Sequence, residues 1–429
     1  MNTGATHEMK AGDSSGALTE PVAPVRSRFF ISMALSNLAI WMAFFAPIQI
    51  LLAQQMEVLA PMHKESALGW VTGIGALVSL FANPLFGAWS DRTVSRFGRR
   101  HPWNIGGALV GALALVVLGQ QHTLPGIMLW WCVVQFALNA MLAALSAEVP
   151  DQVPVTQRAV CSAWVGVTQP LGVVAGALLV TLLAHDIAQG YLLVAVVLVL
   201  CALPFVGLVR DSPLRRDERP AWNARAFLRG FWISPREYPD FAWAWATRFL
   251  INLGNAIGTL YMLYFLHDRL HYEQLFPGKT SADGLLIVVT VYTAGVLVGA
   301  FAGGVLSDRS GRRKIHVILS SVVMTVAALM LMPPPTWLLV LAAAAVLGLG
   351  YGIYVAVDQA LITQVLPLAT DRGKDLGIIN IANSAPQVVA PAIAAILVTR
   401  LGGYPGLYLA TAAFTLLGGV LVRRIRNVP

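Results

Sequence analysis

Two short stretches of the chain combine glycine, acidic and basic residues in the same order. The first, at residues 87–100, reads Gly-x-x-x-Asp-Arg and later Gly-Arg-Arg; the second, at 304–313, repeats both elements. Asp91 and Asp308 are 217 residues apart in a chain of 429 residues, which is about half the chain. Carboxylates and guanidinium groups can form ion pairs, and a carboxylate can also accept hydrogen bonds from a helix N-terminus. The chemistry indicated is ion pairing that can form and break.

Both stretches lie between long apolar segments. Hydrophobic residues make up 57% of the chain, charged residues only 12%, and the mean hydropathy is +0.69. That leaves too few polar side chains to cover a soluble globule of this size. The net charge of +8 does not indicate nucleic-acid binding, because the basic residues sit in short loops where they set topology and contact anionic lipid head groups. We therefore predict an integral membrane protein.

Other kinds of chemistry are not indicated. Cys132, Cys161 and Cys201 fall inside apolar runs without paired spacing, so we expect neither a disulfide framework nor a metal site. A phosphate-binding Gly-x-x-x-x-Gly-Lys loop is missing from the sequence, and the glycine-rich run 348–352 lies within an apolar segment, where it serves helix packing. We expect no catalytic residue, no cofactor and no enzymatic activity.

The fold predicted is an all-α membrane protein with twelve transmembrane helices. Apolar windows near 20 residues long, enough to cross about 30 Å of hydrocarbon, occur at 29–53, 67–89, 103–121, 125–147, 159–184, 189–209, 241–267, 284–306, 315–332, 336–358, 374–398 and 404–422. Of 29 Lys and Arg residues, the only ones in one set of alternate loops are Lys64, Arg269, Lys279 and Arg400. This bias puts both termini in the cytoplasm of a plasma (inner) membrane.

Matched features divide the chain into two six-helix bundles around a central cavity. Glu148 matches Asp358 at an offset of 210 residues, and the segment 154–158 resembles 367–372. Such internal repeats are typical of transporters. We predict a disordered cytoplasmic tail at 1–25, bundles at 26–209 and 241–422, a cytoplasmic linker with an amphipathic segment at 210–240, and a basic tail at 423–429.

With these features the chain resembles the major facilitator superfamily. Twelve spans, a central basic loop and the doubled signature all agree with it. The first copy resembles most the glycoside-pentoside-hexuronide cation symporters and the plant sucrose transporters. Five residues separate Arg92 from Gly98, whereas one separates Arg309 from Gly311, and the long spacer is the mark of that branch. The resemblance implies a monomeric secondary active transporter that moves a small polar solute, a sugar or glycoside, by alternating access.

We predict that the two copies of the signature form a gate on the cytoplasmic side. We expect its two first glycines to permit close helix approach, and its aspartates to accept hydrogen bonds from helix N-termini of the other half. We expect the arginines of each copy to pair with the acidic residue of their own half, Glu148 or Asp358. The gate residues are Gly87, Asp91, Arg92, Gly98, Arg99, Arg100, Glu148, Arg158, Gly304, Asp308, Arg309, Gly311, Arg312, Arg313, Asp358 and Arg372.

The resemblance also implies that helices 1, 4, 7 and 10 line the cavity, with 2, 5, 8 and 11 beside them. Polar side chains buried in these helices are costly unless they face the cavity or a partner. Amides and phenols suit a ligand with many hydroxyl groups, although any single amide can instead join two helices. The substrate-binding candidates are Asn37, Gln49, Gln135, Asn139, Gln169, Arg248, Asn252, Asn255, Tyr351, Tyr354, Asn380, Asn383 and Gln387.

Two questions remain open from the sequence. Arg248 is the one basic residue inside a span, and it either reaches to the inner interface or lines the cavity, where it would bind a substrate oxygen or carboxylate. Coupling to H⁺ needs a titratable group in the pathway, and the candidates are Asp358, Glu148, His185 and Asp186. Sodium coupling lacks the acidic residues inside helices 2 and 4 on which the glycoside branch relies. Facilitated diffusion stays open.

The alternative function is efflux of drugs or secondary metabolites by a transporter of the same fold. Drug exporters often carry a Gly-Pro-rich motif in helix 5. Here helix 5 contains Gly166, Pro170, Gly172 and Gly176 without a tight Gly-Pro pair, which favours import.

Overall fold

A computed structural model describes residues 21–219, 234–365 and 372–426. Throughout the described residues the regular structure is helical, and twelve helices are long and apolar enough to cross a membrane. This confirms the predicted all-α architecture. The Trp and Phe residues of the predicted amphipathic segment, 222–232, lie outside the described residues, as does most of the tail at 1–25.

The N-terminal half holds the first six spans. Its first span is continuous through three elements, because a π-helical stretch joins two α-helices. The elements are α1 (Ser27–Ala46), η1 (Pro47–Leu51), α2 (Leu52–Leu59), α3 (Lys64–Ser90), α4 (His101–Gly119), α5 (Leu124–Gln152), α6 (Val155–Leu183) and α7 (Ile187–Leu208).

The C-terminal half holds the other six. Its elements are α9 (Pro239–Leu260), α10 (Met262–Tyr264), η2 (Phe265–Arg269), α11 (Tyr272–Leu275), α12 (Ser281–Ser310), α13 (Arg313–Met330), α14 (Trp337–Val365), α15 (Arg372–Arg400), α16 (Gly403–Leu421) and η3 (Val422–Arg424). Several helices, such as α5 and α14, continue past the predicted apolar window, because a helix does not stop where the hydrocarbon layer stops.

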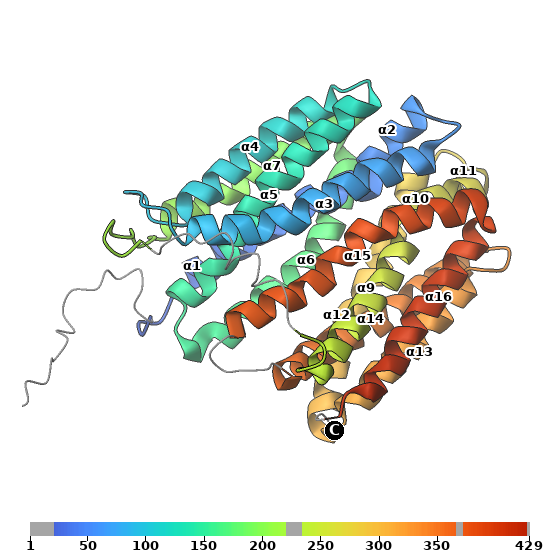
Figure 1. Cartoon of the computed structure of the whole chain (residues 1–429). Helices are drawn as coiled ribbons and strands as arrows, with labels where there is room; N and C mark the ends of the chain where they lie inside the picture. The colour runs from blue at the N-terminus through green and yellow to red at the C-terminus, as the bar shows by residue number, and fades with distance from the viewer. Residues whose placement is uncertain (1–20, 220–233, 366–371, 427–429) are drawn as a thin grey trace, which may run out of the picture.

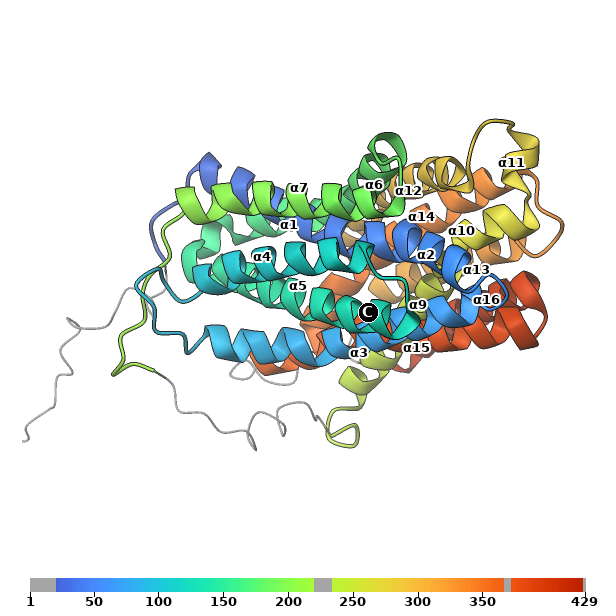
Figure 2. The same cartoon turned by 90° about the horizontal axis from the view of Figure 1, so that it is seen from above.

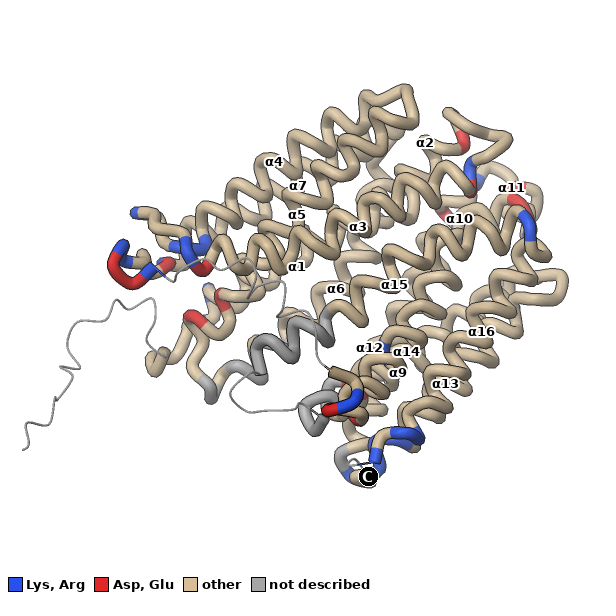
Figure 3. Tube along the Cα trace, viewed as in Figure 1, with Lys and Arg blue, Asp and Glu red and all other residues tan. Residues whose placement is uncertain are grey.

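The two halves meet through two pairs of helices. Helix α3 packs on α15, and α6 packs on α12, whereas most other contacts stay within one half (Figure 1). Figure 2 shows the same two groups from above. In the described part of the chain, charged residues gather at the two ends of the bundle and are nearly absent from its middle (Figure 3).

We name the two ends by their residues. The motif side carries the loops 91–100 and 311–312 and both ends of the described chain; the opposite side carries the loops 60–63 and 270–280. In Figure 1 the ribbons of the two halves converge on the opposite side and diverge toward the motif side.

Glycines let α12 and α14 touch backbone to backbone. A Cβ atom added at Gly299 would overlap the carbonyl of Leu349, and one at Gly348 would overlap that of Tyr292. Gly352 stands against the carbonyl of Val296 in the same way. The run 348–352 therefore serves helix packing, as predicted, and it fixes α14 closely on α12.

Candidate functional site

A buried ion pair joins two helices of the C-terminal half. Arg248 Nε on α9 is 2.6 Å from Asp358 Oδ2 on α14, and the two side chains are only 4% and 3% exposed. Neither charge reaches the end of the bundle. Arg248 thus pairs inside the protein instead of extending to the interface. Breaking such a pair by removing one partner costs about 3–5 kcal/mol.

Amides and phenols extend from this pair across several helices. Tyr351 Oη donates to Asn252 Oδ1 at 3.1 Å, and Asn252 Nδ2 donates to Asn383 Oδ1 at 3.1 Å. Tyr292 Oη on α12 donates to Asn255 Oδ1 at 3.2 Å. Helices α9, α12, α14 and α15 are therefore linked by one group of polar side chains. Sequence analysis missed Tyr292, since a single phenol in an apolar run gives no signal.

The predicted partners of Asp358 are wrong. We expected Arg309, Arg312 or Arg313 to pair with it, but it pairs with Arg248. Arg309 and Arg312 are exposed at the end of the bundle, whereas Asp358 faces α9 and is buried. A buried carboxylate is stabilised by a cation buried beside it, and among the described residues Arg248 is the cation that enters the bundle at that depth.

Two predicted amides of the N-terminal half, Asn37 and Asn139, behave differently. Asn37 Nδ2 donates to the carbonyl of Met33 at 3.0 Å, one turn earlier on the same helix. Asn139 Nδ2 donates to the carbonyl of Gln135 at 2.8 Å, again within one helix. These buried amides are satisfied locally and link no helices to one another by the bonds described.

The remaining substrate candidates are scattered. Tyr354 is buried beside Tyr351, with ring centroids 6.1 Å apart. Gln49 is half-buried in η1, and Gln169 and Gln387 are exposed on α6 and α15. The side chain of Asn380 lies outside the described residues. The structure thus brings together Arg248, Asn252, Asn383 and Tyr351 of the C-terminal candidates, whereas Gln387 stays apart from them on an exposed face.

The first motif forms a compact ion-pair cluster within its own half. Arg100 lies 2.5 Å from Asp91 and 2.8 Å from Asp151, and Arg99 lies 2.7 Å from Asp151. Burial lowers the pKa of the Arg100 guanidinium, but the carboxylates of Asp151 and Asp91 outweigh it, and the net pKa is raised. We predicted Glu148 as the partner of these arginines; Asp151, one turn further along α5, takes that place.

Asp211 holds the loop against the start of α4. Its Oδ2 accepts hydrogen bonds from the backbone N–H groups of Arg100, at 2.5 Å, and His101, at 2.9 Å, so it satisfies the N-terminus of α4. Gly98 makes this possible. It adopts a φ of 95°, and a Cβ atom there would overlap the Asp211 carboxyl group. Asp211 was missed from the sequence because it follows the motif by more than a hundred residues.

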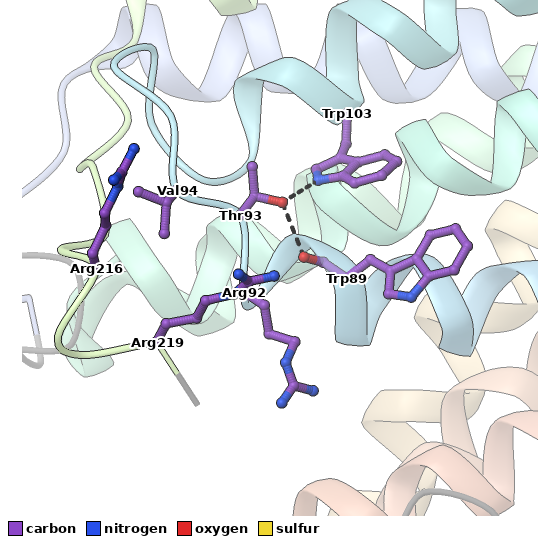
Figure 4. Close-up of a pocket in the computed structure, with 7 residues that line it drawn as sticks. All are labelled: Trp89, Arg92, Thr93, Val94, Trp103, Arg216 and Arg219. Carbon is purple, nitrogen blue, oxygen red and sulfur yellow. Dashed lines mark hydrogen bonds between the residues drawn. The ribbon is translucent and has the colours of Figure 1, made fainter. Parts of the chain in front are cut away.

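The outer face of this loop carries a cavity of about 640 Å³ between the motif and the segment after α7. Arg92, Arg216 and Arg219 line it together with Trp89, Thr93, Val94 and Trp103. Trp103 Nε1 donates to Thr93 Oγ1 at 2.7 Å, so two of the side chains that line the cavity are bonded to each other (Figure 4). Arg92 of the predicted gate therefore lines this cavity together with Arg216 and Arg219 of the segment after α7.

In the second motif, no other helix of the described chain packs against the glycines. Apart from the neighbouring residues and backbone of its own helix, no described heavy atom lies within 4 Å of a Cβ position at Gly304 or Gly311, and the same holds for Gly87 in the first motif. Gly311, with a φ of 63°, ends α12. The close helix approach that we expected at Gly87 and Gly304 is not seen among the described residues in this conformation. The side chains of Arg158, Asp308 and Arg372 lie outside the described residues.

On the opposite side, polar contacts join the two halves. Lys64 of α3 lies 2.8 Å from Asp268 of η2 and 3.3 Å from Glu57. Tyr261 Oη donates to the carbonyl of Glu65 at 2.6 Å, and Tyr264 Oη donates to that of Ala53 at 3.0 Å. We call these residues the opposite-side clasp. Sequence analysis singled out Lys64 only as an exception to the charge bias.

Two six-helix halves that converge on one side and diverge on the other, built from helices long and apolar enough to cross a membrane, define a polytopic membrane protein. The chain belongs to the Major Facilitator Superfamily, whose sequence model matches residues 29–282 and 279–429. It is an integral, multi-pass membrane protein and a secondary transporter. The prediction that it is not an enzyme agrees with this family.

Two sequence relatives are sucrose transport proteins of Arabidopsis thaliana. The chain is 29% identical to SUC3 over 156 residues, 30% of this chain and 25% of the relative. It is 30% identical to SUC4 over 112 residues, 25% of this chain and 22% of the relative. The matches span about a quarter of each relative, and they agree with the predicted resemblance to sucrose transporters.

Solved structures share the fold over nearly the whole chain. A point mutant of the nucleoside transporter NupG superposes with a TM-score of 0.74 at 12% identity, covering 92% of this chain and 99% of that one. The human organic anion transporter MFSD10 gives a TM-score of 0.67 at 16% identity, covering 93% and 100%. At these identities the likeness shows the fold alone.

Proposed function

We propose that this protein is a proton-coupled symporter of a small polar solute, a sugar or glycoside. The observation that carries the proposal is the buried Arg248–Asp358 pair within the polar cluster of Tyr351, Asn252 and Asn383. A titratable carboxylate lies there beside the amides and phenols that suit hydroxyl groups.

The coupling step follows from the ion pair. When Asp358 takes up a proton, its charge is lost and the Arg248 guanidinium is released to donate hydrogen bonds to a solute oxygen. When the proton leaves, the pair forms again and the solute loses that donor. Binding of solute and proton therefore favour each other, which is the thermodynamic requirement for symport.

Alternating access supplies the transport cycle. We take the motif side as cytoplasmic, following the loop charge bias, with both termini there and the protein in the plasma membrane. The conformation described is then closed outside by the opposite-side clasp and open inside. In the outward-open state the clasp would separate, and the two motifs would close as the cytoplasmic gate. In this cycle the two halves, which the linker 210–240 separates in the sequence, move relative to each other as rigid bodies.

The solute class rests on two supports. The cluster consists mainly of neutral amides and phenols, which suit a polyhydroxyl ligand. The relatives SUC3 and SUC4 carry sucrose transport in their names, and we extend a sugar or glycoside to this chain on that basis.

Transport by reconstituted protein tests the proposal. Proteoliposomes are given an inward proton gradient and labelled sucrose or other glycosides, and the Asp358→Asn variant is compared with wild type. We expect wild type to accumulate solute, and the variant to lose accumulation while it keeps solute exchange, because exchange needs no net proton movement.

The matched control is Asp186→Asn, at another sequence candidate for coupling, which the structure places at the N-cap of α7 in the N-terminal half, apart from the polar cluster. Asp186 caps α7 on the opposite side, where it accepts a hydrogen bond from the Gln189 backbone N–H at 2.7 Å, and asparagine caps helices as well as aspartate. This variant should accumulate solute like wild type. Wild-type transport that ignores the proton gradient, or full accumulation by Asp358→Asn, would refute proton symport. Efflux of an apolar dye without sugar uptake would favour the exporter alternative.

A further inference from the structure

We propose that His101, Glu148 and Asp211 form a binding site for a divalent metal ion, Zn²⁺ or a similar cation, inside the N-terminal half. The site is distinct from the polar cluster of the C-terminal half, and it does not depend on the proposed transport function. Its ligands come from the start of α4, the end of α5 and the segment after α7.

The three side chains are close together and buried. One possible ligand atom from each lies within 4.8 Å of the others. His101 is 4% exposed and Glu148 is 0% exposed. The Asp211 side chain is 5% exposed, and its Oδ2 lies 3.7 Å from His101 Nδ1. An imidazole nitrogen and two carboxylate oxygens are a donor set that suits Zn²⁺.

Buried polar atoms around the cluster have no partner among the described residues. Gln152 donates to one oxygen of Glu148, Oε2, whereas Glu148 Oε1 makes no hydrogen bond there. Asn104 is one turn after His101 on α4 and is 1% exposed, yet neither its Oδ1 nor its Nδ2 has a partner in the described part of the chain. Orphaned buried polar groups are rare in proteins, so several in one place indicate a missing ligand.

The two acidic side chains of the cluster also favour binding of a cation. Glu148 and Asp211 bring two carboxyl groups together in a dry place, where like charges repel strongly. The nearby arginines form their ion pairs with other carboxylates: Arg99 pairs with Asp151, and Arg100 pairs with Asp151 and Asp91. A divalent ion would neutralise the two carboxylates and complete their coordination.

The second half offers a natural comparison. After its Gly-Arg-Arg element stands Lys314 where the first half has His101, and its matched acid, Asp358, pairs with Arg248. A metal cation at the Lys314 position would be repelled by the lysine. The donor set therefore belongs to the first half alone among the residues that the structure describes.

Zinc titration of the full-length protein tests the site. Chelator-treated protein in detergent is titrated calorimetrically with ZnCl₂, and the variants His101→Asn and Glu148→Gln are compared with wild type. We expect one tight site in wild type and a loss of affinity of about 100-fold or more in each variant, since even second-shell changes at metal sites cost about 10–100-fold.

The matched control is His267→Gln. His267 lies 3.3 Å from Glu273, but the two side chains are 52% and 38% exposed on the opposite side, so this variant should keep the tight site. Should the site variants fail to fold, the absorption spectrum of Co²⁺ bound to wild type still decides, because a ligand set with one imidazole differs from one with oxygens alone. Wild type without a stoichiometric tight site, unchanged binding by both site variants, or a Co²⁺ spectrum without nitrogen ligation would overturn the proposal.

Discussion

The two halves of this transporter have the same motif and the same helix order, but their buried polar residues are used differently. In the C-terminal half, Asn252 bonds to Tyr351 on α14 and to Asn383 on α15. In the N-terminal half, Asn37 and Asn139 bond to carbonyls one turn earlier on their own helices. The difference teaches that the amides beside the buried ion pair join helices in the C-terminal half, whereas in the N-terminal half the helices are joined elsewhere, by Gln55, which bonds to Tyr191 and to the carbonyl of Leu118.

The matched acidic residues show the same contrast. Asp358 is paired with an arginine deep in α9, whereas Glu148 lies with His101 and Asp211 near the motif. The second half thus keeps its matched acidic residue in a buried ion pair between two helices. The first half is arranged to hold its loop, its linker and α4 together.

The largest expected effect comes from breaking the buried pair. Arg248→Met leaves the Asp358 carboxylate buried without a cation, which should lower the free energy of unfolding by about 3–5 kcal/mol. Arg99→Met should cost less, because its partner Asp151 is 20% exposed and keeps Arg100 as a second partner. Thermal unfolding in detergent measures both. Equal losses would contradict the contrast between the halves, and Arg248→Met/Asp358→Leu should recover most of the stability.

Transport kinetics give the second test. Asn252→Ala leaves the Tyr351 hydroxyl and the Asn383 amide without their partner, and groups unpaired in this way cost about 1–3 kcal/mol each. We expect the KM for solute to rise about 10-fold or more. Asn139→Ala, which removes a bond within one helix, should change it less. A larger rise in KM for Asn139→Ala than for Asn252→Ala would indicate that the solute binds nearer to the N-terminal half.

The two motif glycines test the loops. Gly98 and Gly311 both have positive φ, but only at Gly98 would a Cβ atom overlap another described group, the carboxyl of Asp211. Gly311→Ala should cost about 1 kcal/mol of stability from backbone strain alone, and Gly98→Ala about 2–3 kcal/mol. Denaturation of each variant measures the two costs. Similar values would mean that the Asp211 cap is unimportant.

The smallest effect is expected where the halves meet. Lys64→Met removes the contact with Asp268, a partly exposed ion pair worth about 1 kcal/mol or less, which corresponds to a shift of up to about 5-fold between conformations. Spin labels at Met62 and Lys279, in exposed loops of the two halves, report the distance. The variant should populate longer distances than wild type. An unchanged distribution would show that the tyrosine contacts alone close this side.

Much of the fold could be predicted from the sequence. Apolar length gave twelve spans, and the doubled motif gave the division into halves, because both are properties of local sequence. Pairings such as Arg248 with Asp358 could not be predicted, since they depend on how each helix is rotated about its axis. Asp211 and Asp268 were missed for the same reason: each acts on a residue far away in the chain, and neither lies in a recognisable pattern.

The glycine contact between α12 and α14 has a mechanical consequence. Two backbones in direct contact have no side chains between them whose rotamers could change to accommodate a displacement. The two helices therefore behave as one rigid unit. Tyr351 and Asp358 lie on one member, and Gly304 with the second motif lies at the end of the other. A change of charge at Asp358 would then move α12 and α14 together as a rigid body. The second motif, at the end of α12, would move with them, and no chain of side-chain rearrangements would be needed.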